Sequence, residues 1–268
     1  MKPALPLEGW RVLVPRSATG RSPAVVALAA AGAEAVVVPL IQTVAPQDPT
    51  TLDDALRALG AGWYDWLVLT SAAAVPILLE RGVADLLAEG RARVAAVGPG
   101  TARALRDAGV EVSLVPRGES TARALAAQLP APSDRPRVLF PRGDLAAPTL
   151  ADGLRGRGWQ VDDVVAYRTI AAEPPPPDVL EAWVDGTIRG ALLTSASTVR
   201  ELHSQLGPPP TSTLLVGIGP TTAAEAARLG LPLAGIAAEQ TMSGLVEALA
   251  KAAATVLPSQ IPSPEEPS

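Results

Sequence analysis

Short hydrophobic runs recur along the chain and alternate with longer segments in which apolar residues have helical spacing. The first four runs cover residues 11–15, 35–38, 66–69 and 94–97, and alanine- or leucine-rich segments separate them. Apolar runs of four or five residues between helical segments are typical of buried strands in a parallel sheet covered by helices. The pattern therefore predicts an α/β protein built from doubly wound parallel sheets.

One turn between such a run and a helix occurs twice. Residues 97–101 read Val-Gly-Pro-Gly-Thr, residues 218–222 read Ile-Gly-Pro-Thr-Thr, and the helical segments that follow end at Gly109 and Gly230. We predict that the threonine caps the start of each helix and that the glycine ends it. Such a turn presents backbone N–H groups and a hydroxyl at the carboxyl edge of a parallel sheet, where open α/β sheets bind ligands.

Other parts of the chain repeat in the same order. Residues 137–142 (Arg-Val-Leu-Phe-Pro-Arg) match residues 11–16 (Arg-Val-Leu-Val-Pro-Arg), and residues 191–199 match residues 67–75. Two further matches are residues 163–169 with 37–43, and 239–241 with 119–121. Because the offset falls only from about 126 to about 120 residues, we predict an internal twofold repeat with five strands in each copy. Residues 112–115 are the predicted fifth strand of the first copy.

Capping residues predict where several helices begin. Ser22 and the proline after it are typical of the N-cap and first position of a helix, which would end at Gly32. Ser71 is predicted to cap the helix that follows it, and further helix is predicted to about residue 89. Ser120 is predicted to cap a helix over residues 121–129.

Two arrangements of domains fit the repeat. A cut in the proline-rich break at residues 130–136 puts five strands on each side. Alternatively, residues 39–46 and 166–174, which occupy equivalent places, both cross between domains and again leave five strands in each. Their prolines and β-branched residues suggest extended strands, which favours the crossed arrangement. The two segments would then form a two-stranded hinge with a cleft between the domains.

In the crossed arrangement, the first domain consists of residues 1–42 and 171–257, and the second consists of residues 46–167. Residues 43–45 and 168–170 are the two linker strands. The last segment, residues 258–268, is rich in Pro, Ser and Glu and is predicted to be disordered.

The composition excludes several kinds of chemistry. The 268 residues contain no cysteine and one histidine, His203, so disulfides, thiolate nucleophiles and metal sites are not expected. The net charge of −5 and the 3% aromatic content disfavour nucleic acid as a partner. No signal segment and no apolar run of about 18 residues is present, which predicts a soluble cytoplasmic protein without membrane contact.

Three stretches of the chain carry a family resemblance. They read Tyr-Asp-Trp-Leu-Val-Leu-Thr-Ser at 64–71, Val-Val-Ala-Tyr-Arg-Thr at 164–169, and Ile-Gly-Pro-Thr-Thr-Ala at 218–223, the last followed by Gly-Leu-Pro at 230–232. In order and spacing the chain resembles uroporphyrinogen-III synthase from Arg11 to about Leu249. The resemblance implies two flavodoxin-like α/β domains joined by a two-stranded linker, with the first domain made from both chain ends. It therefore favours the crossed arrangement.

The resemblance also implies a reaction. The linear tetrapyrrole hydroxymethylbilane is closed to uroporphyrinogen III with inversion of ring D and loss of water, without a metal or cofactor. Loss of the hydroxymethyl oxygen gives an azafulvene on ring A, and the substituted carbon of ring D attacks it to give a spiro intermediate. The substrate thus supplies its own electrophile and nucleophile. The protein needs a proton donor for the departing hydroxyl and a cradle for eight carboxylates.

Tyr167 is the candidate proton donor. It lies beside the predicted hinge and matches the family's cleft tyrosine, and a phenol stays protonated at neutral pH. The alternative is a packed tyrosine with its hydroxyl in solvent. Tyr64, the only other tyrosine, precedes a strand between two tryptophans and is predicted to be structural.

Hydroxyl residues at helix starts form the candidate carboxylate cradle, and they are Ser71, Thr101, Ser195, Thr221 and Thr222. Their hydroxyls and the adjacent N–H groups would face the ligand with the helix dipole behind them. The alternative is ordinary N-capping, worth about 1 kcal/mol of stability. By the resemblance, Thr222 and Ser195 face the cleft.

Two arginines, Arg16 and Arg142, end the first strand of each repeat and are candidate partners for substrate carboxylates. The alternative is a solvated surface arginine. His203 falls in the middle of a predicted helix among polar residues and is predicted to be exposed and inert.

Two other functions stay open at this point. A nucleotide-sugar-dependent two-domain transferase would suit two α/β halves, but no Gly-x-Gly-x-x-Gly follows the first strand and no Walker sequence appears. A non-catalytic hinge-closing binding protein is the second, although such proteins are usually exported. A small-molecule tetrapyrrole is the one partner predicted, and a monomer is expected because two domains already make the cleft.

Overall fold

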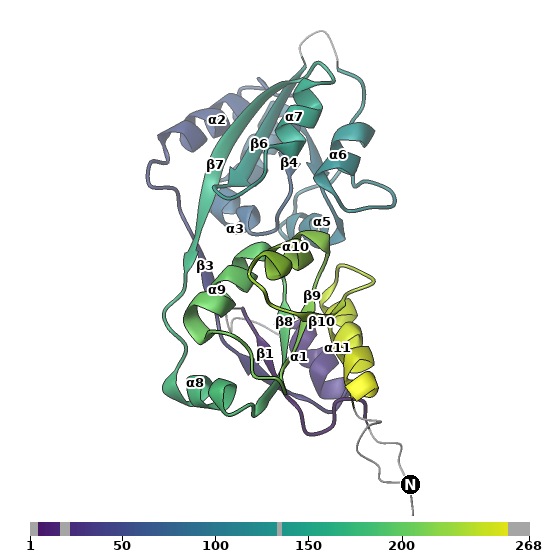
Figure 1. Ribbon diagram of the computed structural model, residues 1–268. Helices are drawn as coiled ribbons and strands as arrows, with labels where there is room; N and C mark the ends of the chain where they lie inside the picture. Colours follow the sequence, from purple (N-terminus) through teal and green to yellow (C-terminus); the bar gives the residue numbers. More distant parts are fainter. Residues whose placement is uncertain (1–4, 17–21, 133–135, 257–268) are drawn as a thin grey trace, which may run out of the picture. The chain divides into compact units, whose positions relative to one another are not determined.

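The computed structural model describes residues 5–16, 22–132 and 136–256. The chain divides into two compact units (Figure 1). Unit 1 comprises Met1–Gln42 and Ala171–Ser268, and unit 2 comprises Thr43–Ile170. The predicted disordered segment, residues 258–268, lies outside the described residues, as does part of the predicted break at 130–136.

Unit 1 contains, in its described part, a five-stranded sheet of order β10-β9-β8-β1-β2. The strands are β1 (Arg11–Val14), β2 (Glu34–Val37), β8 (Ile188–Leu193), β9 (Leu214–Gly217) and β10 (Leu233–Ile236). Every neighbouring pair is parallel, so all carboxyl ends lie at one edge. That edge is where the predicted ligand residues of this unit follow their strands.

Helices cover both faces of the unit 1 sheet, and they are α1 (Pro23–Ala30), α8 (Pro177–Val184), α9 (Ala196–Leu206), α10 (Pro220–Arg228) and α11 (Met242–Val256). Alternate strand residues point to opposite faces. Leu13 therefore packs with Trp183 of α8 and Leu202 of α9, whereas Val12 packs with Leu28 of α1 and Leu249 of α11. Figure 1 shows α1 and α11 together on one side of this sheet.

Unit 2 contains, within the described ranges, a second five-stranded sheet of order β3-β7-β6-β4-β5. Its strands are β3 (Ile41–Val44), β4 (Trp66–Leu69), β5 (Arg93–Ala96), β6 (Arg137–Gly143) and β7 (Gln160–Ala171). The pairs β6–β7, β4–β6 and β4–β5 are parallel. The prediction of parallel α/β sheets is thus confirmed in both units.

Two separate cores fill the faces of the unit 2 sheet. Its helices are α2 (Thr50–Gly60), α3 (Ala74–Leu79), α4 (Val83–Gly90), α5 (Pro99–Asp107), α6 (Ala122–Gln128) and α7 (Thr149–Arg155). Buried residues of α2, α3 and α5 pack on the face that carries Leu139 of β6, and those of α6 and α7 pack on the face that carries Phe140. Side chains that meet at the carboxyl edge are therefore those that point to the same face of the sheet.

Both places where the chain passes between units lie in strands β3 and β7, which are neighbours in one sheet. The predicted extended strand within residues 39–46 is confirmed as β3. The predicted linker residues 168–170 belong to the twelve-residue strand β7. The last residues of β7 remain part of the sheet because β3 is their neighbouring strand.

Three local predictions are wrong. Residues 112–115 do not form a strand, since they contribute one isolated bridge, from Leu114 to Ala95. The N–H groups of Ser113 and Leu114 both donate to the carbonyl of Val94, so the ladder does not advance along β5. Ser71 is not the N-cap of the next helix, because α3 begins after Ala73. The further helix predicted to about residue 89 is present as α4, which follows Gly82 with its φ of 72°.

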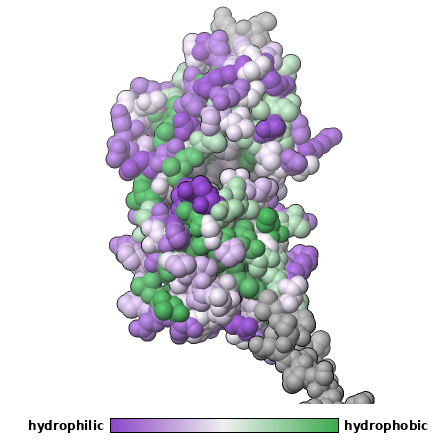
Figure 2. Space-filling model, in the orientation of Figure 1, coloured by the Kyte–Doolittle hydropathy of each residue, from purple (hydrophilic) through white to green (hydrophobic). Residues whose placement is uncertain are grey.

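The third error concerns the start of α6. Its N-cap is Thr121, whose hydroxyl accepts from the N–H of Ala124 at 3.1 Å, and not the predicted Ser120. Among the residues described, no helix is long and apolar enough to cross a membrane. Hydrophilic side chains are spread over the face of the protein shown in Figure 2.

Candidate functional site

The predicted site residues fall into two sets, one at the carboxyl edge of each sheet. The unit 2 set contains Ser71 after β4, Thr101 after β5, Arg142 in β6 and Tyr167 in β7. The unit 1 set contains Arg16 after β1, Ser195 after β8, and Thr221 and Thr222 after β9. Parallel pairing explains this placement, because it brings every strand–helix turn of a sheet to the same edge.

Tyr167 is the candidate acid of the unit 2 set. Its side chain is 8% exposed and belongs to the core formed with α2, α3 and α5. Residue 167 pairs with Gly143 of β6, where the register of the two strands shifts. A Cβ added to Gly143 would lie 2.7 Å from Cζ and 2.9 Å from Oη of Tyr167, so the ring fills the space that only a glycine leaves open.

Two polar groups act on the phenol of Tyr167. Burial raises its pKa above the ordinary value, the nearby Ser71 hydroxyl opposes this as a hydrogen-bonding partner, and the carboxylate of Asp144 raises the pKa further. Asp144 is held beside the tyrosine, since its N–H donates to the carbonyl of Tyr167 at 3.0 Å and its Oδ1 accepts from the N–H of Thr169 at 3.0 Å. The phenol therefore carries its proton at neutral pH.

Gly143 and Asp144 were missed by the sequence reasoning. The matching hexapeptides ended at residue 142, one residue too early. A glycine followed by an aspartate after a strand is typical of a turn, and that was the only signal in the sequence. Their contact with Tyr167 depends on strand pairing across 24 residues of chain, which the local pattern does not contain.

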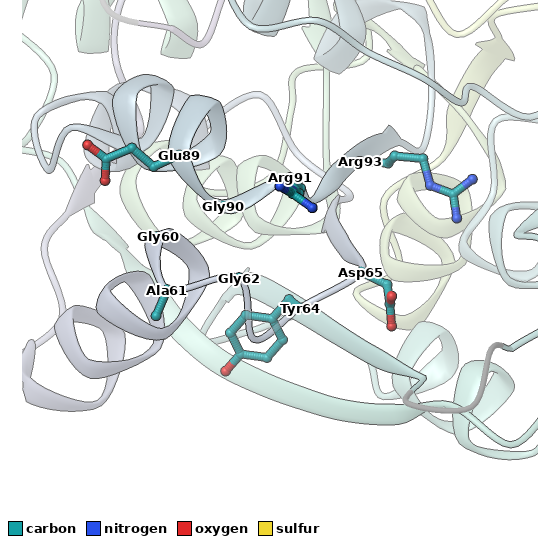
Figure 3. A pocket seen from close by; sticks show the side chains of 9 residues that line it. All are labelled: Gly60, Ala61, Gly62, Tyr64, Asp65, Glu89, Gly90, Arg91 and Arg93. Atoms are coloured by element: carbon teal, nitrogen blue, oxygen red, sulfur yellow. The ribbon is translucent and has the colours of Figure 1, made fainter.

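Tyr64 has the structural role that was predicted. It is buried, and its hydroxyl donates to Oδ2 of Asp162 at 2.8 Å. Burial, with the hydrogen bond to Asp162 next in importance, raises the pKa of Tyr64 far above its usual range. Figure 3 shows it in a cavity of about 490 Å³ near the amino ends of β4 and β5. None of the predicted site residues lines this cavity.

The prediction that a threonine caps each Gly-Pro helix is wrong. The N-caps are Gly98 and Gly219, and a proline at the first helical position places Thr101 and Thr222 in the third. At that position their side chains point inward, and they are 6% and 2% exposed. Thr222 packs beside Gly217, since a Cβ there would lie 3.5 Å from its Cγ2.

Thr101 and Thr222 are therefore buried residues in the first turn of each helix and not exposed N-caps, and their predicted role as ligand groups stays a prediction. Thr221, the residue before Thr222, is exposed, so its hydroxyl is accessible to a ligand. The first-turn N–H groups of both helices remain as donors, because residues in a first turn have no intrahelical acceptor.

The predicted glycine helix ends are confirmed. Gly109 has a φ of 79° and Gly230 a φ of 70°. In the first helix the N–H groups of Gly109 and Val110 donate to the carbonyls of Arg106 and Leu105. The same two bonds recur around Gly230, which makes both ends Schellman motifs.

Ser195 and Ser71 both use their hydroxyls near helix starts. Ser195 caps α9 in a reciprocal capping box with Thr198, with its Oγ accepting from the N–H of Thr198 at 3.1 Å. Oγ of Ser71 accepts from the N–H of Ala73 at 3.2 Å, just before α3. Both serines are half-buried, and the Ser195 hydroxyl also donates to Oγ1 of Thr198 at 3.4 Å.

The two arginines differ in their freedom to bind a ligand. Nη1 of Arg16 donates to Oγ of Ser22 at 3.3 Å. Arg142 is committed to protein groups, since its Nε donates to Oδ2 of Asp163 at 3.3 Å and its Nη1 to the carbonyl of Gly143 at 3.1 Å. Asp163 also pairs with Arg155 of α7, which places Arg142 on the face opposite Tyr167. Arg142 thus lies at the predicted edge of the sheet but on the other face from Tyr167, and its role as a carboxylate partner stays a prediction.

In the part of the chain that the structure describes, no group of three or more His, Asp or Glu side chains is arranged to hold a metal ion. The site that the residues do form is a protonated phenol with a serine, a glycine and an aspartate around it. Comparisons with known proteins identify the family of the chain.

Residues 22–247 match the family described as uroporphyrinogen-III synthase HemD. The chain belongs to this family. The similar curated proteins include uroporphyrinogen-III synthase of Synechococcus elongatus, 30% identical over 91% of this chain and 96% of that protein. The chloroplastic uroporphyrinogen-III synthase of Oryza sativa subsp. japonica is 27% identical over 90% of this chain and 80% of that protein.

Solved structures of the same family share the fold. A mutant uroporphyrinogen III synthase of Thermus thermophilus has a TM-score of 0.60, at 21% identity over 92% of this chain and 99% of that one. The uroporphyrinogen-III synthetase of Helicobacter pylori has a TM-score of 0.58, at 18% identity over 90% of this chain and 99% of that one. The α/β organisation with mainly parallel sheets is therefore that of the uroporphyrinogen-III synthases.

Proposed function

We propose that this chain closes hydroxymethylbilane to uroporphyrinogen III, with inversion of ring D and loss of water, as a lyase of tetrapyrrole biosynthesis. The observation that carries the proposal is the protonated, enclosed phenol of Tyr167 at the carboxyl edge of a sheet in a member of this family. Closure needs one proton for the leaving hydroxyl, and Tyr167 can supply it.

The proton balance of the reaction fits a single acid. Tyr167 protonates the hydroxymethyl oxygen as it departs as water, which leaves a protonated (cationic) azafulvene on ring A and a phenolate on Tyr167. The substituted carbon of ring D attacks this azafulvene to form the spiro intermediate. After recyclisation, the proton lost when the last pyrrole regains aromaticity returns to the phenolate. General acid catalysis of this kind contributes roughly 10²–10⁴-fold, and no cofactor takes part in the balance.

Substrate carboxylates need donors, and we propose that the carboxyl edges of both units provide them. The N–H groups at the start of α5 and α10, the exposed hydroxyl of Thr221 and the guanidinium of Arg16 are the groups in question. Helix N-termini favour anions through their free N–H groups and their dipole. Thr101 and Thr222 are buried as whole residues, so the proposed cradle does not depend on their hydroxyls.

We further propose that the two units are flavodoxin-like copies of one repeat. When the strands are matched by the repeated sequences, the order β2-β1-β8-β9-β10 of unit 1 corresponds to the order β7-β6-β4-β5 of unit 2. The bridge at Leu114, which lies beside β5, takes the place of β10. Both orders read 2-1-3-4-5, as in flavodoxin. The paired Schellman motifs and the paired caps Thr121 and Thr241 support the same relation.

The proposed reaction has a direct test. Hydroxymethylbilane is generated in situ, the purified chain is added, and the uroporphyrinogen isomers are separated by chromatography. Isomer III is expected, because uncatalysed closure gives the isomer without inversion. If isomer I alone forms with the folded protein, the proposal is wrong.

The same protein sample tests two secondary points. A thermal-shift screen with nucleotide sugars is expected to show no stabilisation, whereas clear stabilisation would favour the transferase. Light scattering after size exclusion is expected to give the mass of a monomer near 27.4 kDa.

A further inference from the structure

Asp144 continues the pairing of β6 with β7 beyond the end of β6, within unit 2. Its N–H donates to the carbonyl of Tyr167 at 3.0 Å, and its Oδ1 accepts from the N–H of Thr169 at 3.0 Å. In a parallel pair, one residue uses its N–H and its carbonyl to bond to two residues that lie two positions apart on the neighbouring strand. Asp144 bonds to residues 167 and 169 in this way, with its carboxylate in the place of its own carbonyl.

A turn after β6 explains why the side chain takes this place. The N–H of Ala146 donates to the carbonyl of Gly143 at 3.1 Å, so the chain turns out of the sheet directly after β6. Oδ1 of Asp144 also accepts from the N–H of Leu145 at 3.0 Å, which fixes the carboxylate at the start of the turn. The carboxylate is therefore bound both to its own turn and to β7.

The ring of Tyr167 lies next to these bonds. It packs against Gly143, the residue before Asp144, where an added Cβ would stand 2.7 Å from Cζ and 2.9 Å from Oη of the ring. The register of the two strands shifts between Arg142 and Gly143, so the regular ladder is interrupted just before it reaches Tyr167. The position of the phenol therefore depends on the bonds that Asp144 makes to β7.

We propose that Asp144 is a positioning residue for Tyr167: its carboxylate holds the backbone of residues 167–169 against the end of β6, and this fixes the phenol where it can protonate the leaving hydroxyl of the substrate. The inference rests on the proposed function. Asp144 takes no part in the proton transfer itself. The place of its Oδ1 is what matters, and a neutral amide oxygen in the same place can accept the same hydrogen bonds.

The charge of Asp144 offers a different explanation for an effect on Tyr167. Burial is the main cause that raises the pKa of Tyr167, and the carboxylate of Asp144 raises this pKa further. Two substitutions separate position from charge. Asp144→Asn removes the charge and keeps an oxygen in the place of Oδ1, whereas Asp144→Glu keeps the charge and moves the carboxylate by one methylene group. Positioning predicts that the asparagine is tolerated and the glutamate is not.

Asp65 provides a matched control in the same sheet. Its N–H donates to the carbonyl of Arg137 at 2.9 Å, and its Oδ2 accepts from the N–H of Arg137 at 3.0 Å. Asp65 is half-buried like Asp144 and ties the start of β4 to the start of β6, at the amino ends of the strands. Asp65→Ala and Asp144→Ala are expected to lower the unfolding midpoint by similar amounts, because each removes a carboxylate that accepts from the backbone of a neighbouring strand.

The first experiment observes the ring of Tyr167 and needs no substrate. Fluorinated tyrosine is incorporated at the two tyrosines of the chain, and the ¹⁹F signal that is missing from Tyr167→Phe belongs to residue 167. Asp144→Ala and Asp144→Glu are expected to move this signal toward its position in the denatured chain. In Asp144→Asn and Asp65→Ala it is expected to stay near its position in the unmodified chain. An unmoved signal in folded Asp144→Ala, or in Asp144→Glu if the alanine variant does not fold, refutes the positioning role.

The second experiment measures the formation of isomer III from hydroxymethylbilane. Asp144→Ala and Asp144→Glu are expected to lower kcat by about tenfold or more while KM stays within about twofold, since misplacing a reacting group by about 1 Å can cost about 10²-fold in rate. Asp144→Asn is expected to recover most of the turnover, and Asp65→Ala is expected to retain it.

Two kinetic results would overturn the positioning role. A normal kcat in Asp144→Glu with a low kcat in Asp144→Asn would show that the charge of Asp144 matters and its position does not. A raised KM with an unchanged kcat in Asp144→Ala would show a contribution to substrate binding instead. Failure of the proposed function itself would show separately, as absence of isomer III with the unmodified chain, and the ¹⁹F signal would still decide whether Asp144 fixes the ring.

Discussion

The packing of Tyr167 on Gly143 gives a substitution that perturbs the candidate acid without removing it. In Gly143→Ala, the new Cβ would stand 2.7 Å from Cζ, 2.8 Å from Cε2 and 2.9 Å from Oη of Tyr167. Ordinary contacts begin at 3.4 Å, so the ring must retreat by about 0.7 Å. The φ of Gly143 lies outside the left-handed region, and an alanine there adds no backbone strain.

The expected effects on stability and on turnover follow from this displacement. Inserting a methyl group into a packed core costs about 1–3 kcal/mol, which a domain with an unfolding free energy of about 5–15 kcal/mol survives. A reacting group misplaced by about 1 Å can cost about 10²-fold in rate. We therefore expect Gly143→Ala to stay folded and to lose about 10- to 100-fold in kcat.

The assay combines the formation rate of isomer III with a denaturant unfolding curve. Gly235→Ala is the matched control, because it also adds a methyl group to a strand but meets its nearest atoms at 3.6 Å or more. It is expected to retain normal turnover. If Gly143→Ala is folded and turns over like the unmodified chain, the position of the phenol does not limit the reaction, and the proposed role of Tyr167 is wrong.

Three further predictions concern Tyr167 and the threonines after β9. Tyr167→Phe is expected to lower kcat by about tenfold or more with little effect on the unfolding midpoint, because it removes only the hydroxyl; an unchanged kcat would remove Tyr167 from the mechanism. Because the pKa of Tyr167 is raised, its ionisation is expected to cause no fall in kcat at pH values below the ordinary ionisation range of tyrosine. A fall in kcat within that lower pH range that disappears in Tyr167→Phe would contradict this. Thr222→Ala is expected to cost about 1 kcal/mol of stability and to leave KM unchanged, because Thr222 is buried. Thr221→Ala is expected to raise KM, because Thr221 is exposed. A raised KM in Thr222→Ala with an unchanged KM in Thr221→Ala would show that the buried threonine contacts the substrate.

Local features of the site could be predicted because their physics is local. The ends of α5 and α10 were predicted at Gly109 and Gly230, where positive φ angles favour glycine. The strand followed by a Gly-Pro turn was also predicted correctly, since the proline fixes its own φ and suits the first helical position. The burial of Thr101 and Thr222 was not predicted, because moving a residue two or three positions along a helix can turn its side chain from solvent to core.

The sequence by itself determined the α/β organisation with mainly parallel sheets and the family. These properties reside in hydrophobic periodicity, in glycine and proline positions and in the order of short motifs, all of which are read along the chain. The tertiary structure alone decided that Gly143 and Asp144 stand against Tyr167 and that Arg142 points to the opposite face. Those contacts depend on the register shift between β6 and β7, which is set by packing across the sheet and leaves no periodic trace in either strand.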